Sequence, residues 1–483
     1  MRAVCSLLIF TLLFLGMGRL IISLRCIRQV SSRINNNRGL SKVRSSTDAV
    51  PRLEGVESKT AELFSVAPMM EYTDRHQRTL FRFLSRHAKL YTEMVTTNAL
   101  VRNEEDPVRF LDADFGVEGP LVLQLGGSDP GQMRDAARIA YKYGYREMNI
   151  NCGCPSDKVA GAGCFGAALM QSPSLVSDLS NAVGDATGAP ATIKCRIGVN
   201  DDDSYEQLAA FVDHVSRHGG VKHFLVHARK AVLGANFTPD DNRKIPPLKH
   251  DYVFRLAEQD FPHLKFSLNG GIESLQDCRR VLDAHPTLAG VMVGRACVNS
   301  VFQWASVDSI LFRDQAGDPG LSRREVLGRY AMYADGIERS QGIRARRALV
   351  KPLLGLFTGE PRGRLFRAKL DEYLLAISQG PQQRQGLTSV GDVILKAAEC
   401  LQPETLDLHP RNWGRDKGGG AVSSVADSGA SASTSTSSST STAKGESLMN
   451  ELRRQQWGAA QDSVGERERE KEVAPSVSAA AKL

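Results

Sequence analysis

The sequence predicts an α/β protein, a (β/α)8 TIM barrel followed by a small all-helical domain, with disordered N- and C-terminal extensions. Short runs rich in Val, Ile, Leu and Phe predict eight strands, at 64–70, 89–95, 121–125, 147–151, 191–197, 223–227, 265–268 and 290–293. Apolar positions that recur every three to four residues predict helices between most of them, at 130–143, 173–183, 205–217 and 275–284. Alternating strands and helices pair in parallel, and eight such units in roughly 250 residues match the usual size of this barrel.

The segment after the first strand argues against the competing fold, an open doubly wound sheet. That fold is expected to carry a Gly-x-Gly-x-x-Gly turn at this place. The first run is followed instead by the sequence PMMEYTD at 68–74. A closed barrel is therefore the better prediction.

The two ends of the chain lack the composition of a packed domain. Residues 1–60 combine an apolar run, 3–18, with a basic segment, 25–47, that has no acidic residue. This predicts a targeting presequence that passes through a membrane to an organelle, a plastid rather than a mitochondrion; a membrane anchor and a cytoplasmic location are the alternatives. Residues 415–483 form a low-complexity tail that predicts disorder. The barrel is expected at 61–313 and the helical domain at 320–402.

Nine cysteines are scattered along the chain without the spacing of a disulfide-rich secreted scaffold, which predicts a reducing compartment. Cys152, Cys154 and Cys164 lie near one another in sequence. No second Cys-x-x-Cys or His pair completes a structural zinc site, so we expect no metal.

Cys154 is the first candidate catalytic residue. It belongs to the sequence NCGCP at 151–155, directly after the fourth predicted strand. The carboxyl ends of the strands form the active-site face of such barrels, so a thiol in this turn can face a substrate. A proton donor must be a neutral thiol near pH 7, as an unperturbed cysteine is. A nucleophilic role, with Lys158 stabilising the thiolate, is the alternative.

Polar residues end other strands as well. Gln124 ends the third run, Lys194 lies in the fifth, and His227 ends the sixth. Asn269-Gly270-Gly271 follows the seventh strand and Gly294-Arg295 the eighth, where backbone amides form the usual phosphate site of these barrels. Simpler explanations stay open: His227 as a core histidine and Asn-Gly-Gly as an ordinary turn. An inward-pointing Lys194 needs an anionic partner.

Six segments together resemble the tRNA-dihydrouridine synthases, between residues 64 and 372. They are APMM at 67–70, NCGCPS at 151–156, HARK at 227–230, NRKIPP at 242–247, NGGI at 269–272 and VMVGR at 291–295. HARK and NRKIPP most resemble the subfamily that reduces uridines 20 and 20a in the tRNA D-loop. The resemblance implies a barrel that binds FMN, followed by a small helical domain.

The resemblance also implies the roles of individual residues. NADPH reduces FMN, the flavin N5 gives a hydride to uracil C6, and Cys154 gives a proton to C5. The residues expected to bind FMN are Pro68, Met69, Met70, Gln124, Lys194, His227, Asn269, Gly270, Gly271, Gly294 and Arg295. Those expected to contact tRNA are Asn151, Arg229, Asp240, Arg243, Arg364 and Arg367. No obligate protein partner is expected.

A basic segment follows the predicted barrel. Residues 321–372 hold twelve Arg and Lys against six Asp and Glu, a net charge of +6 in a chain whose total is +7. Clustered cations neutralise RNA phosphates and release counterions, so this segment predicts a tRNA-binding surface. Two other functions stay open: an FMN barrel that acts on a free pyrimidine or enone, and an RNA-binding protein without catalysis.

Overall fold

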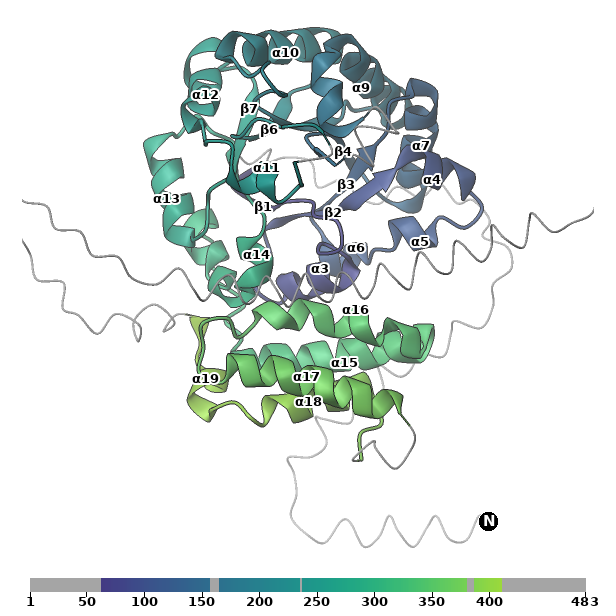
Figure 1. The fold of residues 1–483 in the computed structure, drawn as a ribbon, viewed down its shortest axis with the longest axis vertical. Coiled ribbons are helices and arrows are strands. Elements are labelled where there is room, and N and C mark those ends of the chain that lie inside the picture. The colour runs from purple at the N-terminus through teal and green to yellow at the C-terminus, as the bar shows by residue number, and fades with distance from the viewer. Residues whose placement is uncertain (1–61, 157–164, 235–236, 380–385, 411–483) are drawn as a thin grey trace, which may run out of the picture. The chain divides into compact units, whose positions relative to one another are not determined.

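The computed structural model describes residues 62–156, 165–234, 237–379 and 386–410 (Figure 1). All of them belong to one compact unit, residues 1–417. The predicted presequence, the predicted tail, Lys158 and Cys164 lie outside the described residues. Within the described part, no helix combines the length and the apolar character needed to cross a membrane.

Eight parallel strands close into a barrel in the order β1 to β8, which confirms the predicted fold class. They are β1 (Phe64–Val66), β2 (Lys89–Thr96), β3 (Leu121–Gly126), β4 (Glu147–Cys152), β5 (Thr192–Arg196), β6 (His223–His227), β7 (Lys265–Asn269) and β8 (Gly290–Val293). Strand β1 pairs with β8 to close the barrel, with Val66 opposite Val293.

Strand β1 is shorter than the predicted run, 64–70. The amide of Ala67 still donates to the carbonyl of Val293, at 2.8 Å. Pro68 follows and has no N–H, so it cannot continue the ladder. The chain leaves the sheet there, which places residues 68–74 over the carboxyl end of the barrel rather than inside a strand.

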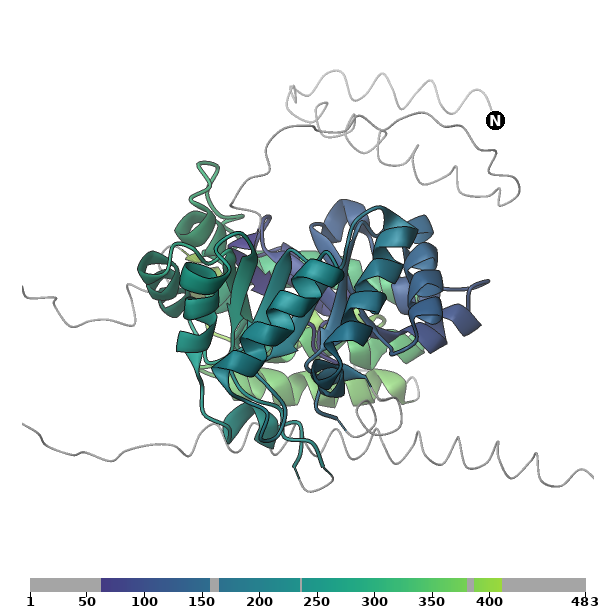
Figure 2. The ribbon, with the colours of Figure 1, turned by 90° about the horizontal axis from the view of Figure 1, so that it is seen from above.

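Helices surround the strands, as Figure 1 shows from the end of the barrel and Figure 2 from a direction at right angles. They are α3 (Arg75–Arg82), α4 (Thr97–Arg102), α5 (Val108–Leu111), α6 (Phe115–Glu118), α7 (Pro130–Tyr143), α9 (Pro173–Thr187), α10 (Tyr205–His218), α11 (Asp241–Lys244), α12 (His250–Arg255), α13 (Leu275–Ala284) and α14 (Ala296–Asn299). Helix α7 has the predicted bounds: the side chain of Asp129 accepts from the amide of Gln132 at its start, and Gly144, with φ of 132°, ends it.

Alternation along the strands separates two apolar regions. Outward side chains such as Ile150, Cys152 and Cys195 belong to the large core between strands and helices. A separate small cluster fills the barrel, and it consists of Ala67, Tyr91, Val122, Leu225 and Met292. Side chains alternate with a period of two, so the next inward positions toward the carboxyl ends of the strands lie at the open end of the barrel. This end is called the mouth below.

Further helices follow the barrel: α15 (Arg323–Gln341), α16 (Arg346–Val350), α17 (Gly363–Ser378), α18 (Val390–Ala398) and α19 (Pro403–Asp407). Helix α15 begins with a capping box formed by Ser322 and Glu325. Arg323 is only 1% exposed; its guanidinium lies 4.0 Å from the centre of the Phe302 ring and 2.9 Å from Glu360. This buried cation ties the helical segment to the end of the barrel.

Candidate active site

The inward side chains at the carboxyl ends of β3 to β7 are polar. Their outward neighbours Leu125, Cys152 and Cys195 pack in the apolar core, so alternation turns the intervening positions toward the mouth. These inward residues are Gln124, Asn151, Lys194, His227 and Asn269. The structure thus brings together five of the residues predicted from the sequence.

A chain of amide hydrogen bonds runs from β3 to Cys154. Gln124 donates from Nε2 to Asn149 Oδ1 at 2.8 Å, and its Oε1 accepts from Asn151 Nδ2 at 2.9 Å. Asn151 Oδ1 in turn accepts from the backbone amides of Gly153 and Cys154, at 3.0 and 2.9 Å. Asn151 therefore fixes the loop after β4, and Gln124 keeps one N–H for a ligand because an amide nitrogen has two.

Cys154 is half-buried in this loop, and its carbonyl accepts from the amide of Ala167 at 2.9 Å. Burial lowers the pKa of Lys194 and of Arg196, and the nearby Cys154 acts in the opposite direction on both. The thiol therefore lies next to the mouth. Cys152, two residues away, is fully buried in the outer core, and burial raises the pKa of its thiol well above the usual value.

Lys194 meets an amide rather than the expected anion. Its Nζ donates to Asn269 Oδ1 at 3.1 Å, and Asn269 Nδ2 donates to the Met292 carbonyl at 2.7 Å. Burial, together with the charge of Arg196, lowers the pKa of Lys194 to about 8. Among the described residues no carboxylate lies within ion-pair distance of Lys194, so this cation is suited to an anionic or electron-rich ligand.

His227 and two glycines form a cradle beside Lys194. Burial and the surrounding cations lower the pKa of His227 well below its usual value, and its Nδ1 has no hydrogen-bond partner among the described residues. Gly270 and Gly271 have φ of 106° and 75°, and a Cβ on Gly270 would lie 3.3 Å from His227 Nε2. Consecutive amides in this conformation form an anion-binding concavity. The orphaned nitrogen and the open cradle both fit a phosphate-bearing cofactor.

Arg196 belongs to the polar strand-end residues that the sequence predicts at the mouth, but the resemblance gave it no role in binding or catalysis. Its buried guanidinium donates to three carbonyls: Gly153 at 2.9 Å, and Lys230 and Asn242 at 3.0 Å each. Burial lowers its pKa to about 10. The signal was present, because Arg196 occupies the next inward position after Lys194 on the same strand.

A basic cluster lies around Asp240. Asp240 pairs with Arg243 at 3.2 Å, Lys244 at 2.7 Å and Arg295 at 3.8 Å. Arg229 donates to the Pro246 carbonyl at 2.7 Å, and burial followed by the charge of Arg295 lowers its pKa. Three cations thus share one carboxylate, and Arg229 adds a fourth positive charge near Arg295, which leaves the cluster positively charged.

Arg364 and Arg367 lie on helix α17, apart from this cluster. Arg364 is exposed, whereas Arg367 is half-buried and donates to the Leu354 carbonyl at 3.4 Å. Burial, and then the charge of Arg364, lowers the pKa of Arg367, which shows that the two guanidinium groups are neighbours. Within the described part of the chain, neither residue contacts the mouth, so they form a second basic surface.

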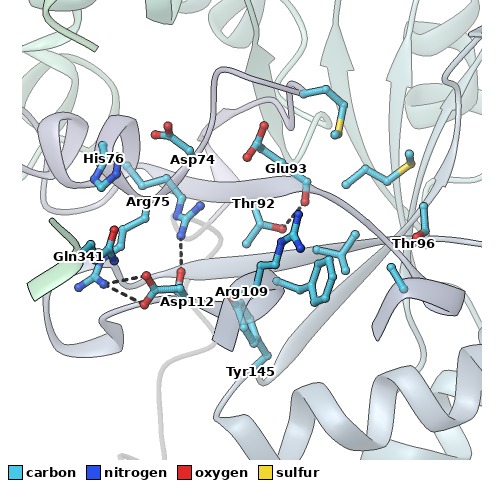
Figure 3. Close-up of a pocket in the computed structure, with 16 residues that line it drawn as sticks. Asp74, Arg75, His76, Thr92, Glu93, Thr96, Arg109, Asp112, Tyr145 and Gln341 are labelled. Carbon is cyan, nitrogen blue, oxygen red and sulfur yellow. Dashed lines mark hydrogen bonds and ion pairs between the residues drawn. The ribbon is translucent and has the colours of Figure 1, made fainter. Parts of the chain in front are cut away.

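The segment after β1 lies between the mouth and a neighbouring cavity. Pro68 and Met69 are half-buried, and Met69 Sδ is 3.6 Å from the position of a Cβ on Gly294. Met70, by contrast, is 54% exposed and lines a cavity of about 420 Å³ together with Glu93 and Arg109 (Figure 3). Cys154 does not line this cavity.

Comparison with known proteins gives a consistent result. Residues 65–383 match the family described as Dihydrouridine synthase (Dus). A protein of Xanthomonas campestris pv. campestris named tRNA-dihydrouridine(20/20a) synthase is 44% identical over 308 residues, which cover 64% of this chain and 87% of the relative. A protein of the same name from Escherichia coli K12 is 42% identical over 343 residues, covering 70% of this chain and 93% of the relative. The mouth residues from Pro68 to Arg295 all lie within the matched range.

Proposed function

The chain belongs to the dihydrouridine synthase family, and from this premise we propose that it reduces uridine to 5,6-dihydrouridine at positions 20 and 20a of the tRNA D-loop. The observation that carries the proposal is the position of Cys154. A backbone fixed by Asn151 holds its thiol next to a mouth in which, among the described residues, Lys194 has an amide partner but no carboxylate and His227 Nδ1 has no partner.

The mouth residues fit FMN. Lys194, His227 and the remaining N–H of Gln124 would contact the ring system or its ribityl chain, against the apolar wall of Pro68 and Met69. The backbone of 269–271, with Gly294 and Arg295, would hold the phosphate. When bound, FMN supplies the hydride that uracil C6 receives, after reduction by NADPH.

The protein itself contributes orientation and a proton. Cys154 would donate its thiol proton to uracil C5. His227 is not a competing acid, because its lowered pKa keeps the imidazole neutral. Arg196 would hold the Cys154 loop through the Gly153 carbonyl without touching the substrate.

Two basic surfaces would bind the tRNA. The cluster of Arg229, Arg243, Lys244 and Arg295 around Asp240 would contact phosphates near the reacting uridine. Arg364 and Arg367 on α17 would contact a more distant part of the same RNA. Asp240 orients its cations and limits their repulsion while the tRNA is absent.

The proposal is tested with purified protein, NADPH and unmodified tRNA transcripts. Mass-spectrometric mapping should find dihydrouridine at position 20, at 20a or at both. Free uracil and a simple enone serve as competing substrates, because a barrel acting on small molecules would reduce them. Reduction of free uracil as efficient as that of tRNA, or a colourless protein that cannot be loaded with FMN, would contradict the proposal.

A further inference from the structure

Of the residues expected to bind FMN, only Met70 lines the cavity beside the mouth. The cavity has a volume of about 420 Å³, within the usual range of ligand pockets. Met70 lies at its edge, on the side of the mouth. Its walls include Met94, Val95, Phe110 and Tyr145. Aromatic and apolar side chains in this part of the wall can accommodate a planar group.

Three of the six charged side chains that line the cavity, Arg75, Arg78 and Asp112, are neutralised within the protein. Arg75 binds both oxygens of Asp112, at 2.8 and 2.9 Å. Arg78 pairs with Glu118 at 2.6 Å. These contacts form the wall of the cavity, and they leave little charge for a ligand.

Three charged groups of the cavity are left without an ion pair among the described residues: Asp74, Glu93 and Arg109. Asp74 uses Oδ1 to cap α3 through the Gln77 amide at 2.9 Å, and Glu93 uses Oε1 for the Glu71 amide. The second oxygen of each carboxylate accepts no hydrogen bond from the described residues. Figure 3 shows Glu93 between Asp74 and the guanidinium of Arg109, which extends into the cavity from the opposite side.

The two carboxylates need hydrogen-bond donors. Burial, and then the charge of Asp74, raises the pKa of Glu93, although Arg78 and Lys351 act in the opposite direction. Two like charges in a partly desolvated pocket are stabilised by N–H groups that reach both of them. The order of groups along this wall is therefore acceptor, acceptor, donor.

We propose that this cavity binds a second, unstacked base of the same tRNA and that this base is a guanine. The N2 amino group and N1–H of guanine donate to Asp74 and Glu93, and its O6 accepts from Arg109. On its Watson–Crick edge, guanine carries two adjacent hydrogen-bond donors followed by an acceptor. On the same edge, uracil has one donor between two acceptors, and adenine has one donor next to one acceptor. Bases in single-stranded RNA are read in this way, on their Watson–Crick edges and by contact with aromatic residues.

The same groups disfavour the other polyanion of the reaction, the nicotinamide dinucleotide. A phosphate placed here would face Asp74 and Glu93, with only Arg109 as an unpaired cation. The inference rests on the proposed function, because a tRNA must be the substrate for a second base to enter.

The experiment compares guanine with inosine, which lacks only the N2 amino group. Transcripts carry inosine in place of each guanine near the target uridine, one at a time, and kcat/KM is measured for dihydrouridine formation. One inosine position should lower kcat/KM of the unaltered enzyme by about tenfold or more, as expected for the loss of a hydrogen bond to a carboxylate. Asp74→Asn keeps the helix cap but removes the charge, so it should lose a similar factor on guanine and discriminate poorly between guanine and inosine.

A second variant and a control make the result decisive. Arg109→Ala changes an exposed residue, so it should fold, and it should lower kcat/KM for tRNA while the KM for NADPH stays constant. Glu104→Gln, an exposed carboxylate outside the cavity, should change neither. Equal kcat/KM on guanine and inosine at every position, or a raised KM for NADPH in the two cavity variants, would overturn the base site alone. Absence of dihydrouridine on every transcript would remove the proposed function and the base site with it.

Discussion

The two ends of the same barrel treat buried charge in opposite ways. At the amino end, Lys89 lies 2.5 Å from Glu62 and 2.7 Å from Glu147; burial acts to lower its pKa, but the two carboxylates outweigh it and raise the pKa. At the carboxyl end, Lys194 has only an amide partner, and its pKa falls to about 8. At the amino end the buried lysine is paired with carboxylates of the protein itself, whereas at the mouth the buried lysine is not paired with a carboxylate among the described residues.

The histidines of β6 repeat this contrast four residues apart. His223, at the amino end, bonds Ser267 Oγ at 2.8 Å and lies 3.8 Å from Glu62. His227, at the carboxyl end, leaves Nδ1 without a partner among the described residues. In such barrels one face serves stability and the other serves function, and here the unmet bonds identify the functional face.

The largest expected effect separates function from stability at the mouth. Cys154→Ala should lower the rate of dihydrouridine formation by about 10²- to 10⁴-fold, the usual contribution of a general acid. FMN content and flavin reduction by NADPH should stay unchanged, as measured by absorbance. Cys152→Ala is the matched control: it empties space in the outer core, so it should lower stability but retain turnover. Full tRNA activity in Cys154→Ala would refute the assignment.

A pair of lysine variants tests the comparison directly. Lys89→Met should lower the free energy of unfolding by about 3 kcal/mol, because it leaves Glu62 and Glu147 without a cation. Lys194→Met should not lower it in flavin-free protein, since it removes a poorly compensated charge, yet it should weaken FMN binding. Urea unfolding and flavin titration measure the two quantities. Equal destabilisation by both variants would show that the two ends do not differ.

A charge reversal on α17 tests a surface that belongs to neither end. Arg364→Glu should raise the KM for tRNA by roughly tenfold and reduce the salt dependence of binding, without loss of flavin. Arg280→Glu, an exposed reversal on α13, is the control and should have little effect. An unchanged KM for Arg364→Glu would remove α17 from the tRNA-binding surface.

The smallest expected effect is a pH dependence that comes from Lys194. Its pKa of about 8 in the folded, flavin-free protein is below the usual value, so the unfolded chain holds this proton over a range where the folded protein has released it. Lys194 therefore lowers the free energy of unfolding least above its unfolded pKa, where it is neutral in both states. As the pH falls through about 8, Lys194 becomes charged in the folded protein and the free energy of unfolding decreases. Denaturant titrations from pH 7 to 10 should show this slope in the flavin-free protein, and Lys194→Met should remove it.

The sequence predicted the fold because each strand and helix carries its own signal. Helices α7 and α13 and strands β6 and β8 have the expected bounds, set by alternation and by caps such as Asp129. The first strand was overestimated because apolar residues continue past Pro68, where the missing N–H, and not hydropathy, ends the ladder. Strand-end position also sufficed to group Gln124, Asn151, Lys194 and His227.

Connections between distant loops could not be predicted in the same way. Nothing local in the sequence indicates that Arg196 reaches residues 230 and 242. The cavity at Glu93 and Arg109 depends on α5 and β2 meeting in space. Such contacts follow from tertiary packing, which periodicity does not encode.

Arg196 gives the mouth a mechanical property. Its guanidinium donates hydrogen bonds to the Gly153 carbonyl, next to Cys154, and to the carbonyls of Lys230 and Asn242, in the stretch that leads to Arg243. RNA that binds this stretch would therefore act on the backbone next to the thiol through one planar guanidinium group. Under the proposed function, this one side chain would couple RNA binding near Arg243 to the position of the Cys154 thiol.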